Sequence, residues 1–259
     1  MYYQLSSYLK FFLRAKRKHG VHSPFVFDFA NACFYQRPDK SVQNELKKYR
    51  QLLCKNHQKI KVHDFGAGSK AMASQEREIA QIAKNAGISF HRACVLHRIV
   101  DRINAKHVLE IGTSLGIGTA SMAIAHPQLC ITTLEGCTQT AAIAQQQFNQ
   151  FGLTAIQLRI GPFEETLTPA LQDVRYDLVF FDGNHQKEAT LQYFEQCLAH
   201  KHEQSVFIFD DIYWSRGMTA AWEIIKKHPE VSVTIDTFYW GMVFFRKGQV
   251  KENFTIRMR

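Results

Sequence analysis

The sequence lacks the features that would place it outside the ordinary globular proteins. No apolar run reaches the ~20 residues that a membrane-spanning helix needs, and the first residues show no basic start, apolar stretch and small-residue cleavage site of a signal peptide. Internal repeats and low-complexity tracts are also missing. We therefore expect a cytoplasmic protein with no stable membrane insertion.

Cysteine pairs and clusters of metal-binding residues are missing too. The 6 cysteines are scattered without a C-x-x-C pair, and the 12 histidines show no zinc spacing. We expect free thiols, neither disulfides nor a zinc site. The chain has 259 residues, of which 46% are apolar, enough for a sizeable core in one α/β domain with an extension.

Acidic residues are scarce at the beginning of the chain. Residues 1–62 contain 13 lysines and arginines against 3 acidic residues, a net charge of +10, and the remainder has a net charge of −1. Such a segment can attract nucleic acid, anionic lipid or an acidic small molecule, and it can also be a solvated face. Residues 2–18 favour an amphipathic helix, suited to a membrane surface or to folding over the active site. A second helix is predicted to begin at Ser23 (N-cap) and Pro24.

The sequence from His107 to Gly118 is the most informative stretch. The apolar run of Val108, Leu109 and Ile111 stops at Gly112, and an alanine-rich helical segment follows Gly118. This order predicts strand, glycine turn and helix, an arrangement that brings backbone N–H groups close to a nucleotide. The spacing G-x-x-x-G-x-G differs from the G-x-G-x-x-G of dinucleotide-binding proteins. A second glycine loop, 64–69, lacks the flanking strands, so we predict only a turn there.

After His107 strands and helices alternate regularly. Five strand–helix units followed by two strands joined by a tight turn predict an α/β fold, a doubly wound and mostly parallel sheet of seven strands with the last antiparallel. The strands are expected at 107–112, 130–135, 154–160, 177–182, 204–210, 231–238 and 241–245. We expect a basic helical extension at 1–62, a helical lead-in at 63–106 and a cofactor-binding core at 107–259.

Glu110 together with Gly112 and Gly116 resembles the E/D-x-G-x-x-x-G motif of class I S-adenosylmethionine-dependent methyltransferases. Their fold is a Rossmann-like sheet of seven strands, as expected here. Glu135 ends the second strand, where an acid would accept both ribose hydroxyls. Phe163 and Glu164 follow the third strand and suit the adenine face and amino group, although a core residue and a helix-terminal acid explain them equally well. The predicted cofactor-binding residues are Glu110, Gly112, Thr113, Ser114, Gly116, Gly118, Thr119, Glu135, Phe163, Glu164 and Asp182.

Three carboxylates end the next two strands. Asp182 closes the fourth strand, and Asp210 and Asp211 close the fifth. Ligands of open α/β sheets bind beyond the carboxyl ends of the strands, so these acids are expected to converge. Like charges repel unless a cation lies between them, which suits Mg²⁺ or a similar ion. Alternatively, Asp182 contacts the cofactor and one of the others caps a helix.

Residues 89–246 resemble the metal-dependent O-methyltransferases, the group of catechol and caffeoyl-coenzyme A methyltransferases. The resemblance implies that Asp182, Asp210 and Asp211 bind the metal. It departs in three places: the usual Asp-Asn pair is Asp-Asp, Gly118 replaces a frequent Ser so that Thr119 or backbone N–H groups would hold the methionine carboxylate, and His185 replaces the usual Lys base. His185 is a plausible base; Lys187, or no side chain, is the alternative.

These features predict a methyltransferase that methylates the oxygen of a small aromatic or amphipathic acceptor with a divalent metal, Asp182 and His185 being catalytic. The extension together with Tyr213, Trp214, Tyr239 and Trp240 would line the acceptor pocket. Two alternatives stay open: a transfer-RNA methyltransferase that uses the basic extension on phosphates, and a non-catalytic cofactor-binding module that docks on a membrane or partner. A homodimer is also possible.

Overall fold

The computed structural model describes residues 2–17, 20–63 and 76–258. The glycine loop at 64–69, predicted to be only a turn, lies outside the described residues. No helix within the described ranges is long and apolar enough to cross a bilayer.

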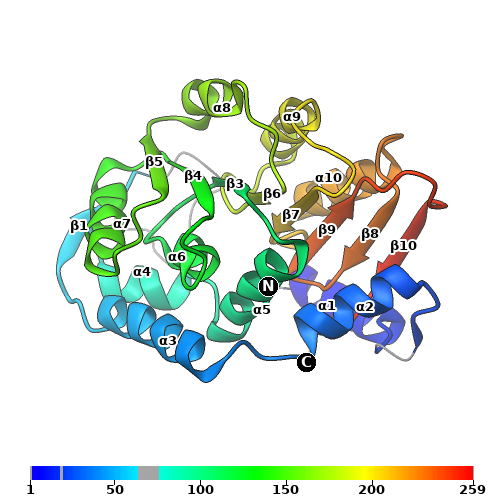
Figure 1. Ribbon diagram of the computed structural model, residues 1–259, viewed down its shortest axis with the longest axis horizontal. Coiled ribbons are helices and arrows are strands. Elements are labelled where there is room, and N and C mark those ends of the chain that lie inside the picture. Colours follow the sequence, from blue (N-terminus) through cyan, green and yellow to red (C-terminus); the bar gives the residue numbers. More distant parts are fainter. Residues whose placement is uncertain (1, 18–19, 64–75, 259) are drawn as a thin grey trace.

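An eight-stranded sheet forms the centre of the molecule (Figure 1). Its strand order is β10-β8-β9-β7-β6-β3-β4-β5, and β9 runs antiparallel to both of its neighbours. The strands are β3 (His107–Ile111), β4 (Cys130–Glu135), β5 (Ile156–Ile160), β6 (Leu178–Phe181), β7 (Val206–Asp210), β8 (Val233–Asp236), β9 (Trp240–Phe244) and β10 (Glu252–Thr255). The predicted doubly wound α/β sheet is confirmed, and its strand order reverses between β3 and β6, where such sheets bind ligands.

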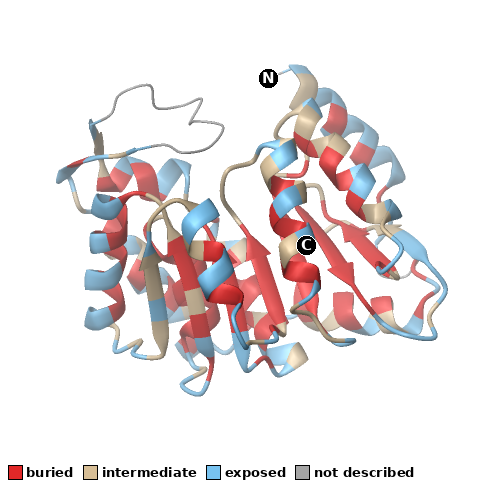
Figure 2. Ribbon diagram, turned by 90° about the horizontal axis from the view of Figure 1, so that it is seen from above, coloured by how far each residue is buried: buried red, intermediate tan, exposed pale blue. Residues whose placement is uncertain are grey.

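Helices cover both faces of the sheet. Helices α8 (Phe163–Leu171), α9 (Lys187–Leu198) and α10 (Arg216–Lys227) pack on one face through one apolar cluster. The other face carries α2 (Pro24–Phe34), α3 (Lys40–Cys54), α4 (Ile79–Asn85), α5 (Phe90–Ile103), α6 (Ile117–Ala123) and α7 (Thr138–Gln150). Figure 2 shows that the central strands between these layers are mostly buried. β6 is buried at every position, as expected for a central strand that reads Leu-Val-Phe-Phe.

The structure adds strands to the predicted seven. After the β8–β9 pair the chain returns as β10, which pairs in parallel with β8. A separate antiparallel pair joins β1 (Lys59–Lys61) to β2 (Glu76–Glu78). Both strands of this pair lie in segments that we predicted to be helical. They are only three residues long, too short to give an alternating pattern that sequence reasoning can recognise.

The N-terminal helices share the core of the main sheet. Helix α1 (Tyr2–Arg14) is shorter than the predicted 2–18. Helix α2 begins as predicted, with Pro24 in its first turn and the Ser23 hydroxyl oxygen accepting from the N–H of Val26. Phe29 and Tyr49 are buried in the same apolar cluster as the strands. The extension is thus packed against the sheet.

Candidate active site

The glycine loop between β3 and α6 lies against the end of β6. Gly112 has φ +109°, and a Cβ there would lie 2.3 Å from the carbonyl oxygen of Asp182. Gly116 has φ +74°, and its Cβ would lie 2.5 Å from the Phe148 ring. Both positions need glycine because they combine a left-handed backbone with a close approach. The motif glycines therefore bring the loop against the turn that follows Asp182.

Glu110 is buried beneath this loop. Its Oε2 accepts hydrogen bonds from the hydroxyls of Thr119 and Thr133, the latter at 2.6 Å. Burial raises the pKa of its carboxyl to about 7, against the effect of these two hydroxyls. Its Oε1 is buried without a hydrogen-bond partner, and a Cβ at Gly118 would lie 2.6 Å from it. Glu110 thus packs beneath the loop and links β3 to α6 and β4 through its hydrogen bonds.

Two threonines that we predicted to be cofactor ligands direct their hydroxyls into the protein. Thr119 donates to Glu110, and Thr113 forms a 2.6 Å hydrogen bond with Thr133. Thr119 is fully buried and Thr113 nearly so. Their hydroxyls connect the glycine loop, β4 and α6.

Glu135 at the end of β4 lies beside the same loop. One carboxylate oxygen accepts from the N–H of Ser114 at 2.7 Å, and the other accepts from the N–H of Cys137 at 2.9 Å. A carboxylate oxygen can accept more than one hydrogen bond. These contacts hold both oxygens at the edge of the sheet, beside the glycine loop.

The predicted adenine residues come from the start of α8. The Phe163 ring lies against Gly183, where a Cβ would approach it to 2.7 Å, and meets Tyr193 edge to face at 6.0 Å. Glu164 accepts a 2.8 Å hydrogen bond from the Tyr193 hydroxyl. Burial, together with this bond, raises the pKa of Tyr193 to about 12. Phe163 and Glu164 therefore form one cluster with the turn after Asp182.

A carboxyl pair lies at the ends of β6 and β7. The carboxyl groups of Asp182 and Asp210 lie close enough to interact. Burial, followed by the neighbouring charge of Asp210, raises the pKa of Asp182 well above its usual value. Arg92 of α5 contacts Asp210 through Nη1, at 3.1 Å from Oδ1 and 3.4 Å from Oδ2. A guanidinium therefore supplies the cation beside two adjacent carboxyl groups.

The three predicted metal ligands are not grouped together in the described part of the structure. Across residues 2–17, 20–63 and 76–258, no three His, Cys, Asp or Glu side chains are grouped so that they could hold an ion. Asp211 follows β7 with φ +53°, and its carbonyl accepts from the N–H of Trp214 at 2.8 Å. Asp210 is engaged by Arg92. The residues as arranged do not fit a divalent ion bound by all three carboxylates.

His185, the predicted base, lies in the turn after Asp182. The turn places Asn184 at φ +67° and His185 at φ +33°, the left-handed region that most side chains avoid. His185 is partly exposed. Lys187, the alternative base, begins helix α9. The chain thus turns sharply after Asp182. Of the two candidate bases, His185 is closer to Asp182 in the sequence than Lys187 is.

Sequence reasoning missed two residues of the site. Arg92 is three residues past Ser89, the N-cap of α5, and 118 positions from its partner Asp210. Tyr49 of α3 is buried and donates its hydroxyl to the carbonyl of Leu115 in the glycine loop at 3.0 Å. In the sequence, an isolated Arg or Tyr on an amphipathic helix does not indicate that its side chain contacts a distant site. Only the packing of α3 and α5 on the sheet reveals them.

The predicted acceptor pocket is only partly as expected. Tyr239 is 47% exposed, and the Arg92 guanidinium lies 5.2 Å from its ring centre. Tyr213 is partly buried, with its hydroxyl donated to Asp236 at 2.5 Å. Trp240 was predicted to line the pocket, but it is fully buried and packs edge to face on Phe180. As the first residue of β9 it faces the core, so it cannot contact an acceptor directly.

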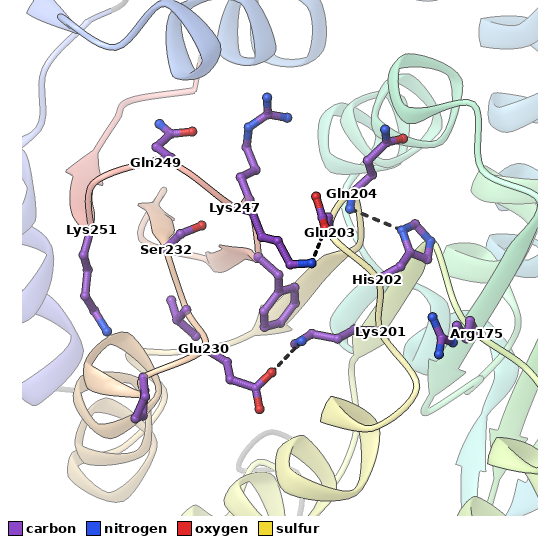
Figure 3. A pocket seen from close by; sticks show the side chains of 14 residues that line it. Arg175, Lys201, His202, Glu203, Gln204, Glu230, Ser232, Lys247, Gln249 and Lys251 are labelled. Carbon is purple, nitrogen blue, oxygen red and sulfur yellow. Dashed lines mark hydrogen bonds and ion pairs between the residues drawn. The ribbon is translucent and has the colours of Figure 1, made fainter.

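A cavity of about 810 Å³ lies elsewhere in the described part of the chain (Figure 3). It is lined by residues at the amino ends of the parallel strands, whereas the glycine loop follows the carboxyl end of β3. Lys201 is paired with Glu230 and Lys247 with Glu203, each at 2.6 Å. The predicted site residues do not line it. Two of its lysines therefore form ion pairs, away from the site described above.

Comparisons with known proteins point to one kind of enzyme. Residues 109–212 match the family described as a methyltransferase domain. The catechol O-methyltransferase of Niastella koreensis is 26% identical over 153 residues, which cover 57% of this chain and 68% of that protein. The residues that match the family model, 109–212, include the glycine loop, Glu135, Asp182 and Asp210.

Solved structures share the fold. The O-methyltransferase TomG of Streptomyces achromogenes, in complex with SAM, has a TM-score of 0.57 at 16% identity and covers 81% of this chain and 92% of its own. An O-methyltransferase from Bacillus cereus, in complex with SAH, has a TM-score of 0.55 at 18% identity, covering 84% and 96%. Fold, motif and sequence relative agree with the predicted enzyme class. Residues 109–212 thus match a methyltransferase domain, and the chain resembles the class I S-adenosylmethionine-dependent O-methyltransferases of the catechol and caffeoyl-coenzyme A group.

Proposed function

We propose that the protein methylates a hydroxyl oxygen of a small aromatic or amphipathic acceptor. One observation supports this most strongly: the glycine loop touches the backbone of Asp182, whose carboxyl group lies beside that of Asp210. The cofactor loop and the polar cluster therefore share one edge of the sheet. The partly exposed ring of Tyr239 stands over Arg92 and offers a flat apolar surface to an acceptor.

The residues present fit S-adenosylmethionine. Bound there, it supplies a methyl group made electrophilic by its sulfonium. In our proposal Glu135 accepts hydrogen bonds from the ribose, Phe163 and Glu164 flank the adenine, and the backbone of the loop between Gly112 and Gly118 approaches the methionine part. The side chains of Thr113 and Thr119 hold this loop in shape through Thr133 and Glu110.

On the acceptor side the protein supplies orientation and removal of a proton. The bound cofactor would supply the methyl group to the acceptor oxygen, and His185 would take the hydroxyl proton. Asp182 and Asp210 accept hydrogen bonds from the acceptor, and Arg92 keeps Asp210 in place. Catalysis of this kind depends mainly on positioning, because the transferred group is already activated.

The divalent metal that the sequence predicts at Asp182, Asp210 and Asp211 is not part of this proposal. The arrangement of these residues does not fit it, and no step of this mechanism passes through a metal. Arg92 already places a positive charge beside the carboxyl pair. We therefore expect methyl transfer to survive removal of divalent ions.

The test begins with calorimetric titration of S-adenosylmethionine and S-adenosylhomocysteine into the wild type, Glu135→Gln and the exposed-site control Glu252→Gln. We expect binding that Glu135→Gln weakens and Glu252→Gln leaves unchanged. No binding to the wild type would overturn the proposal.

A screen of hydroxylated acceptors, with catechol first, then follows methyl transfer with and without EDTA. His185→Gln is compared with Lys187→Gln, and we expect only the former to abolish transfer while cofactor binding is retained. Loss of transfer in EDTA with recovery in Mg²⁺ would contradict the metal-free mechanism and support the predicted metal site.

A further inference from the structure

Helix α1 exposes an unusual amount of apolar surface. Among the described residues, 10 large hydrophobic side chains are exposed, and 6 of them belong to this 13-residue helix. They are Tyr2, Leu5, Tyr8, Leu9, Phe12 and Leu13. Scattered apolar residues on a surface need no explanation, whereas a contiguous patch marks an interaction site.

The patch lies on the outward face of the helix. Successive residues are about 100° apart around an α-helix, which sets Leu5, Leu9 and Leu13 on one side. The buried residues Ser7 and Phe11 lie on the opposite side and face the protein. Tyr2 is 90% exposed and Leu13 84%. A helix at the surface of a water-soluble domain normally shows the reverse pattern.

The flanks of the patch are attached to the protein. Tyr8 contacts the Phe238 ring edge-on at 5.0 Å, and the Phe12 ring is covered by the Arg257 guanidinium at 3.6 Å. The Tyr3 hydroxyl donates to Thr219 at 2.8 Å. The helix is thus anchored through its inner face and edges, which leaves Tyr2, Leu5, Leu9 and Leu13 as the outer stripe.

Positive charge accompanies the outer stripe. Lys10, Arg14, Lys16 and Arg17 are all exposed, and no acidic residue precedes Asp28 in the sequence. A second copy of the chain would bring equal positive charge against this face, and the two faces would repel each other. An anionic surface would instead be attracted to it. The charges therefore favour a partner that is apolar inside and negative outside.

We propose that the outer stripe of α1 docks on the surface of a bilayer that contains anionic phospholipid. The helix would lie in the plane of the interface, with its leucines below the headgroups and its lysines and arginines among the phosphates. With 13 residues, α1 is too short to span the bilayer, and surface docking requires no spanning helix. Phe238 contacts both α1 and Tyr239, so docking sets the acceptor side of the site beside the headgroups.

Co-sedimentation of the full chain with lipid vesicles tests the proposal. The wild type is compared with the double variant Leu9→Glu/Leu13→Glu and with Val250→Glu, a matched control because Val250 is 79% exposed and lies outside α1. With vesicles of phosphatidylcholine and phosphatidylglycerol, we expect the wild type and Val250→Glu to bind and the double variant to lose roughly tenfold in affinity. Circular dichroism verifies that all three are folded.

Three results would overturn the proposal. They are no binding of the wild type to the anionic vesicles, equal binding to phosphatidylcholine alone, and equal binding of the double variant. Sedimentation velocity without lipid adds an independent check. A wild-type dimer that dissociates in Leu9→Glu/Leu13→Glu would assign the stripe to contact between copies instead.

Discussion

At the scale of single residues, Arg92 connects Asp210 with two of the aromatic residues predicted to line the acceptor pocket. Its guanidinium contacts both oxygens of Asp210, which is 5% exposed, and lies near the rings of Tyr239 and Trp240 at 5.2 and 5.9 Å. An ion pair with so little exposure is costly to break from one side, because the remaining charge is left without compensation.

Replacing Arg92 by Met is therefore expected to destabilise the fold by about 3 kcal/mol, measured by urea unfolding at neutral pH. Adding Asp210→Asn to Arg92→Met removes the stranded charge and should restore part of that loss. Equal stability of Arg92→Met and Arg92→Met/Asp210→Asn would show that the Asp210 carboxyl becomes neutral when Arg92 is absent. Arg92 would then not be needed to compensate a charge at Asp210.

Glu110 gives a prediction about pH. Burial raises the pKa of its carboxyl from the ordinary 4.5 to about 7, so the folded state retains a proton that the unfolded chain releases. The stabilisation is fully present below pH 4.5 and is lost as the pH rises towards 7.

Glu110→Gln has no proton to release and should lose less stability over this interval. The difference between variant and wild type is expected to reach at most about 3 kcal/mol. Urea unfolding of the ligand-free proteins at several pH values measures it. Parallel curves for the two proteins would show that Glu110 is not the group that titrates.

At the scale of elements, the loop between β3 and α6 depends on glycine at Gly112 and Gly116, where it approaches its neighbours closely. Gly152, which lies outside this loop after α7, is a matched control for Gly116 because the two have similar backbone angles, φ +65° and φ +74°. They differ in their surroundings, because a Cβ at Gly116 would press on the Phe148 ring, whereas one at Gly152 has no atom within 4 Å.

Gly152→Ala should cost only the backbone strain of about 1 kcal/mol. Gly116→Ala adds a collision in a buried loop and should cost about 3 kcal/mol in all, with weaker cofactor binding. Thermal unfolding and calorimetry of both variants measure this. Similar losses in the two variants would mean that Phe148 moves aside easily and that packing does not constrain the loop.

At the scale of the whole molecule, cofactor binding should stabilise the folded chain. A ligand that binds only the folded state at 100 times its Kd adds about 2.7 kcal/mol. We expect S-adenosylhomocysteine to raise Tm in the wild type and Glu252→Gln and to have little effect in Glu135→Gln. An equal rise in all three would remove Glu135 from the binding site.

The order of strands and helices after His107 could be predicted because most of the buried strands are short apolar runs that end at a glycine or an acid, as β3, β6 and β7 do. Ser23 and Pro24 likewise identify the start of α2. The short strands β1, β2 and β10 could not be predicted. They form by pairing with segments 15 or more residues away, and local sequence contains little of that information.

The sequence by itself determined the doubly wound sheet, the glycine loop, Glu135 beside it and the carboxylates at the ends of β6 and β7, because these features depend on local pattern and on the direction of parallel strands. Only the tertiary structure decided which cation meets those carboxylates. Arg92 reaches Asp210 from a helix 118 residues earlier, and Trp240 turns into the core. The same packing leaves the leucines of α1 facing outward, because only the arrangement of neighbouring elements decides which side of an amphipathic helix is covered.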